Sequence, residues 1–382
     1  MLLKEGLNID MPEEIQIPTQ RIKSLEGLRV IALFLIVISH FEFLETIDGI
    51  GNIYSIYFHN AMLGVDFFFV LSGFGLMLSF LRHPIEGKIT LKDSFLFAIN
   101  KIKKLYPIVI FSLILAIPHL CVSSTLSVGG VFKVGGKLII GASLLGSLTG
   151  MSMFSHAGNG VLWFYSCLFI IYLISLWICK FLKKCCCSAK KSLLFLVGTF
   201  LVIIALTFVF SFIDGKWKFD DFQYGSPYIR VFFVMLGMEL ALLYVYMPKF
   251  HRAKWIEIIS FILCVAWFLT RNLVNAPFFV LRLIDVPLVV ILVFSFSYQE
   301  GPLSFLFNTK FFQAQSRYTP YVYLLHYPIR MSLVAIIENY ISINLAIGLI
   351  IVVTILALTI GLSILSDFLL QKWTSKLQKG QN

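Results

Sequence analysis

Apolar runs of about twenty residues, separated by short polar segments, repeat along most of the chain. An α-helix rises about 1.5 Å per residue, so a run of this length is what a helix needs to cross the bilayer core. The pattern predicts ten spans, near residues 27–46, 61–81, 105–122, 161–180, 192–213, 228–247, 255–270, 278–297, 319–338 and 342–368. We therefore expect an all-α, polytopic transmembrane helical bundle.

Composition supports a membrane protein and excludes a soluble domain. The 382 residues are 59% hydrophobic and 13% charged, with a mean hydropathy of +0.89. The net charge of +11 collects in a few loops, which is typical of cytoplasmic loops and not of nucleic-acid binding. The expected partners are membrane lipids, with no nucleic acid. We divide the chain into a cytoplasmic tail (1–24), a transmembrane domain (25–371) and a cytoplasmic basic tail (372–382).

Loop charge predicts the orientation of the spans. The tail before the first span and the loop 82–104 are rich in Lys and Arg, whereas the loop 47–60 is acidic. The apolar stretch 138–153 is a candidate eleventh span, but it would place the basic loop around 180–191 outside. We therefore interpret 123–160 as an external or re-entrant excursion, with both chain termini cytoplasmic.

Two ionisable residues share one face of the first span. Arg29 and His40 are eleven residues apart, so helical geometry returns them to nearly the same direction, about 16 Å apart along the axis. Ionisable groups within a bilayer are costly and usually functional. Arg29 and His40 are therefore candidate catalytic residues that face one cavity.

The second span carries Asp66 and Ser72. Measured from the span centres, Asp66 and His40 lie at similar depths, roughly 7 Å and 5 Å outward. A carboxylate that orients an imidazole is a recurrent way to make a general base, so Asp66 is a candidate partner of His40. The alternative is an Asp that bonds backbone at the outer interface. Ser72 is a candidate donor contact.

Later spans contain further polar residues. His326 and Arg330 lie four residues apart on one helix face, which predicts either a substrate pocket or a buried His with an Arg that reaches towards the interface. Glu239 lies mid-span and needs a partner or a proton, and Arg230 near an outer end is a candidate substrate contact. Another pair, Arg282 and Asp285, favours an internal ion pair.

The cytoplasmic segment KIKKLYP places Lys101 and Lys104 three residues apart just before a Tyr-Pro helix start. Such a pair could bind phosphates at the membrane surface. The alternative is ordinary anchoring to anionic lipid.

Taken together, these segments resemble the membrane acyltransferase-3 family over roughly residues 20–370. The similar segments are SLEGLRVIALFLIVISH, GVDFFFVLSGFGL, KIKKLYP, VLWFYSCLFIIYL (which contains Trp163), SPYIRVFFVMLGMELALL and YVYLLHYPI. They occur in the order that the family's helices have. The combination is specific, although any single segment would be weak.

The resemblance implies transfer of an acyl group, usually acetyl, from cytoplasmic acyl-CoA to a hydroxyl of an extracytoplasmic glycan or lipid-linked sugar. It implies that Arg29 and His40 are the first helix's basic residue and His, and that Lys101 and Lys104 bind the donor. Trp163, Arg230, Glu239, His326 and Arg330 are then candidate substrate contacts, and no metal is expected. The implied location is a bacterial inner membrane, in the form without an esterase-like domain; a homo-oligomer is left open.

Two departures from the family pattern affect these expectations. Lys replaces Arg in the loop motif, which keeps the charge but loses the bidentate fork. Cys167 and Leu168 follow the LWF element where many members carry an acidic residue. The alternative function is a transporter or flippase for a glycan or glycolipid, which would use the same intramembrane charges. The chain lacks the visible repeat halves that many transporters have.

Overall fold

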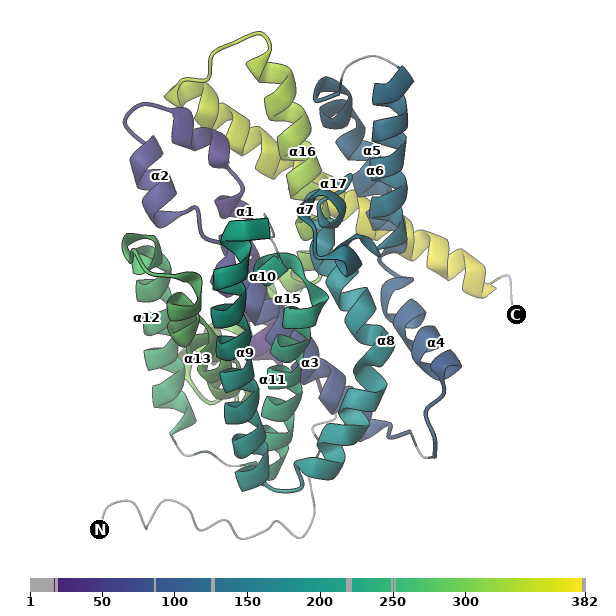
Figure 1. Ribbon diagram of the computed structural model, residues 1–382, viewed down its shortest axis with the longest axis vertical. Coiled ribbons are helices and arrows are strands. Elements are labelled where there is room, and N and C mark those ends of the chain that lie inside the picture. The colour runs from purple at the N-terminus through teal and green to yellow at the C-terminus, as the bar shows by residue number, and fades with distance from the viewer. Residues whose placement is uncertain are drawn as a thin grey trace.

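The computed structural model describes residues 20–85, 87–124, 128–217, 222–248 and 252–379, together with residues 17 and 250. These residues form helices and no strand, as expected (Figure 1). The α-helices are α1 (Lys23–Ser39), α2 (Gly51–Tyr57), α3 (Met62–Arg82), α4 (Leu91–Ile102), α5 (Tyr106–Val122), α6 (Val128–Ser143), α7 (Ser152–Ser155), α8 (Leu162–Cys185), α9 (Ala189–Trp217), α10 (Phe222–Gly225), α11 (Pro227–Tyr246), α12 (Ala253–Thr270), α13 (Phe278–Ser297), α14 (Pro302–Phe307), α15 (Lys310–Ser316), α16 (Thr319–Glu338) and α17 (Leu345–Lys379). Three short 3₁₀ helices are η1 (Glu42–Thr46), η2 (Gly146–Thr149) and η3 (Arg271–Leu273).

Seven helices among the described residues are long and apolar enough to cross a membrane. The pair α4 and α5, bent by 59° at its break, would make an eighth. The expected span at 319–338 is helical throughout as α16, over 20 residues. The expected span at 27–46 is helical only in part, because the 17-residue helix α1 ends at Ser39 and the short 3₁₀ helix η1 covers 42–46. These findings support a multi-pass membrane protein, while the ten-span count and the orientation stay predictions.

The apolar stretch 138–153 does not form one continuous helix. It is divided among the end of α6, the 3₁₀ helix η2 and the start of α7. Leu144 and Gly150 have φ angles of 54° and 69°, left-handed values that a helix crossing the membrane could not contain. This geometry supports the interpretation of 123–160 as an excursion.

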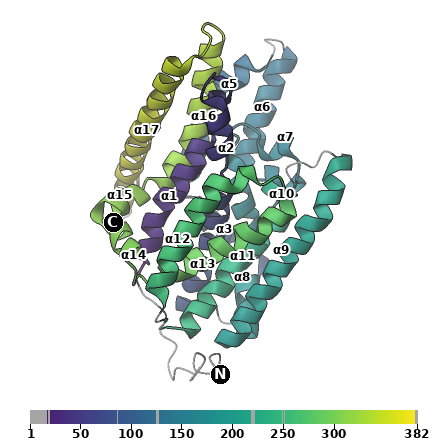
Figure 2. The ribbon, with the colours of Figure 1, turned by 90° about the vertical axis from the view of Figure 1, so that its left-hand side faces the viewer.

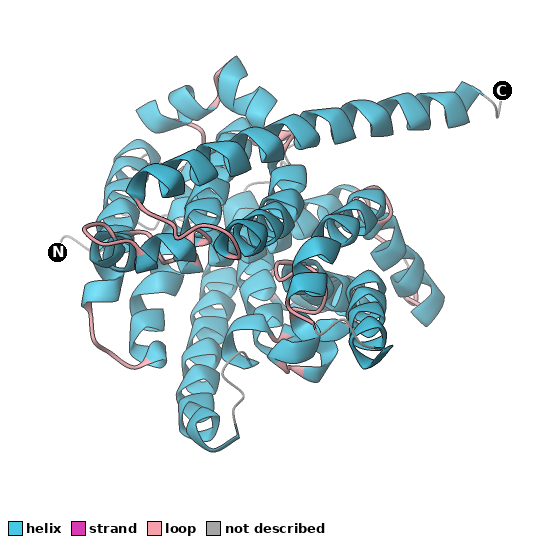
Figure 3. Ribbon diagram, turned by 90° about the horizontal axis from the view of Figure 1, so that it is seen from above, coloured by secondary structure: helices cyan, strands magenta, loops and turns pink. Residues whose placement is uncertain are grey.

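Helix α1 has packing partners from several parts of the chain. It packs against α3, α13, α14, α15 and α16, and α16 in turn packs against α5 and α17. Figure 2 shows α17 and α9 at opposite edges of the bundle, with α1 between them. Seen from above, the C-terminal part of α17 extends beyond the other helices (Figure 3). The central position lets α1 present side chains to cavities on the α16 side.

Close backbone contact between α3 and α11 fixes the position of α3. A Cβ atom added to Gly73 would lie 1.8 Å from the carbonyl oxygen of Val234, and one added to Gly237 would lie 1.8 Å from that of Val70. Only glycine allows this approach, as in other tightly packed membrane helices.

Five buried charges tie α3, α11, α13 and the end of α12 together. Asp66 accepts hydrogen bonds from Arg230 (2.6 Å) and from Arg282. Arg282 also lies 3.6 Å from Asp285, which accepts a 3.0 Å bond from Arg271. The expected internal pair of Arg282 and Asp285 is thus confirmed, as part of a larger network. Since unpaired charges are costly inside a bundle, the network makes the arrangement of these helices specific.

Candidate active site

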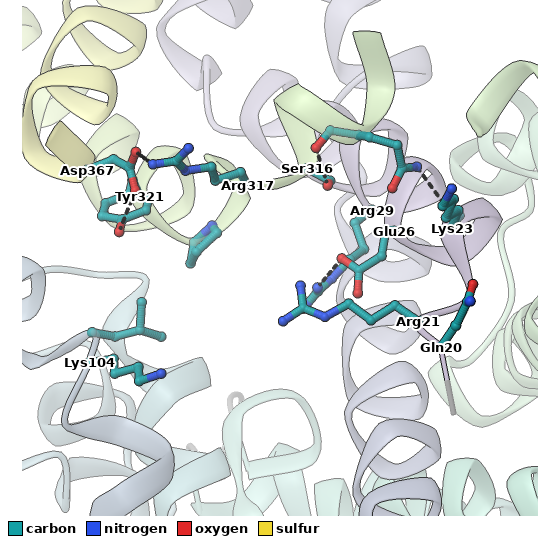
Figure 4. Close-up of a pocket in the computed structure, with 13 residues that line it drawn as sticks. Gln20, Arg21, Lys23, Glu26, Arg29, Lys104, Ser316, Arg317, Tyr321 and Asp367 are labelled. Atoms are coloured by element: carbon teal, nitrogen blue, oxygen red, sulfur yellow. Dashed lines mark hydrogen bonds and ion pairs between the residues drawn. The ribbon is translucent and has the colours of Figure 1, made fainter. Parts of the chain in front are cut away.

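A large cavity opens at the end of the bundle where α1 begins. It has a volume of about 660 Å³, and its walls come from α1, the turn between α4 and α5, α15, α16 and α17. We call it the first cavity. Figure 4 shows Arg21 and Lys104 extending into it from opposite sides. Its charged residues are the cations Arg21, Lys23, Arg29, Lys104 and Arg317 and the carboxylates Glu26 and Asp367.

Five cations against two carboxylates give the first cavity a net charge of +3. Arg29 is paired with Glu26 at 2.8 Å, and Arg317 is paired with Asp367. The other three cations form no ion pair within the described part of the chain; they are Arg21, Lys23 and Lys104. A wall with three unpaired cations suits a ligand that carries several negative charges.

A second, narrower cavity continues inward from the first. It has a volume of about 180 Å³ and shares Arg29, Leu105 and Pro320 with the first cavity. Its other polar wall residues lie between phenylalanine and leucine side chains; they are Ser72 of α3, Tyr165 and Tyr172 of α8, and Thr319 and Tyr323 of α16. It is therefore a mostly apolar passage with a few hydroxyl groups, and Arg29 stands at its entrance.

Two imidazoles meet beyond the inner end of this passage. His40 directly follows the last residue of α1, and its Nδ1 lies 3.0 Å from Nε2 of His326 on α16. Tyr323 connects the pair to the second cavity, since its ring lies 6.0 Å from that of His326. His326 is 1% exposed, whereas His40 is half-buried. His40 is thus the more exposed member of the pair, and neither imidazole itself lines any of the three cavities.

A third cavity lies on the far side of the histidine pair. It has a volume of about 460 Å³, and Glu42, Arg330 and His119 are among its walls. Glu42 and Arg330 form an ion pair at 2.9 Å, two residues after His40 and one helical turn after His326. The order along both α1 and α16 is therefore first cavity, second cavity, histidine pair and third cavity.

The structure corrects the expected contact between Asp66 and His40. Asp66 projects from the face of α3 that meets α11 and α13, so its carboxylate binds Arg230 and Arg282. His326 occupies the place beside His40 that was predicted for Asp66. Similar depth in the membrane did not imply that the two side chains face each other.

Two expected substrate contacts are buried inside the bundle instead. Arg230 is fully buried, and its guanidinium lies 4.9–5.7 Å from four aromatic rings, one of which belongs to Trp163. Neither residue lines any of the three cavities. Their contacts indicate a structural role around Asp66.

Glu239 and Lys101 also lie outside the three cavities. Glu239 lies between α11 and α9, where it accepts a 2.7 Å hydrogen bond from Thr199. Lys101 is in the last turn of α4, with its Nζ over the ring of Phe97, whereas Lys104 is in the turn after the helix. Because α4 ends at Ile102, the two lysines lie on different elements, and only Lys104 lines the first cavity.

Several cavity residues were not predicted. Tyr165 and Tyr172 are seven residues apart on α8, a spacing that could have indicated one polar face. Arg317 and Asp367 are 50 residues apart, so no local pattern relates them. Within the described residues, no group of three or more His, Cys, Asp or Glu side chains is placed to hold a metal ion.

A known protein family matches nearly the whole chain. No curated protein and no solved structure matches the chain significantly. A family model described as an acyltransferase domain, of the acyltransferase-3 type, matches residues 22–366. This range contains His40, His326 and five of the seven charged residues of the first cavity. The resemblance predicted from the motifs is confirmed, and the chain belongs to the acyltransferase-3 family.

Proposed function

We propose that the protein transfers an acyl group, acetyl by resemblance, from acyl-CoA to a hydroxyl of a glycan or lipid-linked sugar across the bacterial inner membrane. The observation that carries the proposal is the order of the cavities, with His40 between a cationic cavity and a separate polar one. Donor and acceptor can then approach one imidazole from opposite sides. The basic loops predicted to be cytoplasmic border the first cavity, which makes it the donor side.

The phosphates of CoA would bind in the first cavity. Lys104, Arg21 and Lys23 are free to pair with them, and Arg29 could exchange Glu26 for a phosphate oxygen. Arginine can bind a phosphate through two parallel hydrogen bonds, whereas lysine acts as a point charge. In this proposal Lys101 does not contact the phosphates, because it lines none of the three cavities.

The acyl-pantetheine arm would extend through the second cavity. Arg29 and His40 are about 16 Å apart along α1, a distance suited to an extended arm anchored by its phosphates. The hydroxyls of Ser72, Tyr165 and Tyr172 could serve the amide groups of the arm, and the apolar walls would exclude water from the thioester.

His40 then acts on the acceptor hydroxyl. As general base, it takes the proton while the oxygen attacks the thioester carbonyl carbon; the C–O bond forms, the C–S bond breaks, and the thiolate of CoA takes the proton back from His40. In the second route His40 first accepts the acyl group and then passes it to the hydroxyl. Both routes give the same ester and free CoA.

The acceptor would enter through the third cavity. Its charged wall residues are Glu42, Arg330 and Glu338. The ion pair of Glu42 and Arg330 follows the two histidines along the chain and offers both an acceptor and a donor of hydrogen bonds. Such a pair can bind a polyhydroxylated sugar and orient one hydroxyl towards His40.

The test is turnover of acetyl-CoA by the purified protein, with and without a crude glycan extract. We expect extract-stimulated release of CoA by the wild type and a loss of about 10²–10⁴-fold in His40→Ala, the range of general base catalysis. His83→Ala, at an exposed site after α3, is the control. Wild-type activity in His40→Ala would refute the mechanism, and absence of both turnover and CoA binding would favour a transporter.

A further inference from the structure

We propose that His326 is a positioning residue that fixes the tautomer of His40 and leaves Nε2 of His40 free to accept a proton. The inference rests on the proposed function, in which it names the atom that acts as base. It also replaces the expectation that His326 contacts substrate.

The hydrogen bonds determine where the protons are. Nδ1 of His326 lies 3.0 Å from the carbonyl oxygen of Val322. A carbonyl oxygen can only accept, so this Nδ1 carries a proton. A neutral His326 then has a lone pair on Nε2, which faces Nδ1 of His40 at 3.0 Å. Nδ1 of His40 must therefore donate, and the lone pair of a neutral His40 is on Nε2.

The surroundings favour the neutral form of His326. Its side chain is 1% exposed, and its ring neighbours are His40, Tyr323 and Tyr327. The nearest charged side chain on its own helix is Arg330, one turn further on. The carboxylate of Glu42 is already paired with Arg330, so it does not balance a positive charge on His326. A second cation here would be buried without a counter-charge, which is costly.

This geometry also stabilises His40 after proton transfer. When Nε2 takes the proton of the acceptor hydroxyl, His40 becomes an imidazolium and its Nδ1–H bond to His326 becomes charge-assisted. The hydrogen bonds from His40 to His326 and from His326 to the Val322 carbonyl hold the tautomer of His40 and stabilise its imidazolium form. In many hydrolases a buried carboxylate has this role. His326 has the same role here without carrying a charge.

Two substitutions of similar volume separate positioning from packing. In His326→Gln, the amide oxygen can accept from His40 while the NH₂ group donates to Val322. In His326→Met the same space is filled by a thioether, a weak acceptor. We expect His326→Met to lower kcat by about 10²-fold with the KM for acetyl-CoA nearly unchanged, and His326→Gln to recover most of that loss. Equal kcat values for the two variants, in folded protein, would overturn the proposal.

A spectroscopic measurement tests the tautomer of His40 independently of enzymatic activity. In ¹⁵N-histidine-labelled protein, signals absent from His40→Gln identify His40. We expect a protonated Nδ1 and an unprotonated Nε2, with the proton preference lost in His326→Met. A proton on Nε2 of wild-type His40 would overturn the inference, even if turnover had confirmed the proposed function. The expected tautomer in a protein without transferase activity would support it and count against the function alone.

Discussion

The cations of the first cavity allow a quantitative test of the donor site. Lys104 and Arg21 enter the cavity from opposite sides and form no ion pair within the described residues (Figure 4). Two unit charges 4 Å apart interact by about 1 kcal/mol in water, a suitable figure for a wall open to solvent. Loss of one phosphate contact should then raise the KM for acetyl-CoA about fivefold. Loss of both should raise it about 30-fold if the contacts are independent.

The assay is steady-state release of CoA by Lys104→Ala, by Arg21→Ala and by the double variant. Because the contacts hold the donor before and during the reaction, KM should rise while kcat stays within about twofold. Lys103→Ala is the matched control, since this exposed neighbour lines none of the three cavities. High salt should raise the wild-type KM for acetyl-CoA and reduce the difference in KM between the wild type and the double variant, because salt screens the charges.

The variant Lys101→Ala distinguishes two donor sites, one formed by the lysine pair of KIKKLYP and one formed by the first cavity. If Lys101→Ala raises KM as much as Lys104→Ala, the paired-lysine interpretation of KIKKLYP is right and the placement of the donor in the first cavity is refuted. If kcat falls in the variants and KM does not change, phosphate contact is refuted.

Two further predictions concern the buried network and the acceptor side. Asp66→Asn removes one of two carboxylates from a network with three arginines and so raises the net charge of the network from +1 to +2. We expect the free energy of unfolding to fall by about 3–5 kcal/mol, seen as a lower Tm in detergent. The control Asp48→Asn, in an exposed loop, should leave Tm unchanged. An unchanged Tm in Asp66→Asn would show that the network is not a stability element. Glu42→Gln should raise the apparent KM for the glycan extract about two- to fivefold and leave the KM for acetyl-CoA unchanged. The reason is that Glu42 lines the third cavity, on the opposite side of the histidine pair from the proposed donor site. A raised KM for acetyl-CoA with an unchanged KM for the extract would place the acceptor elsewhere.

The helical class and the main helices could be predicted because their signal is local. Runs of twenty apolar residues predict membrane helices wherever they occur, and Arg29 and His40 share one helix, so their common face followed from spacing alone. The basic segment KIKKLYP is also a local signal, and of its two predicted phosphate-binding lysines Lys104 lines the first cavity whereas Lys101 does not.

The pairing between distant helices could not be predicted in this way. His40 and His326 are 286 residues apart, and nothing in either segment shows that α1 packs beside α16. Asp66 was assigned to the wrong neighbour because its depth in the membrane does not determine the direction in which its side chain points. The direction of its side chain depends on the contact of α3 with α11, which the glycines Gly73 and Gly237 permit.

The ion pair at the entrance of the second cavity has a consequence for membrane integrity. A passage that leads into a bilayer-spanning protein is a potential leak for ions. In the resting protein Glu26 balances Arg29 at that entrance, and beyond it the walls are mostly aromatic and aliphatic. A small anion such as chloride would have to compete with a carboxylate already bonded to the guanidinium and then lose its hydration, a large cost in such surroundings. A donor with several phosphates would have Arg21, Lys23 and Lys104 to pair with in the first cavity, and it could then displace Glu26. The same pair would therefore admit the donor and keep the membrane's ion gradients intact between turnovers.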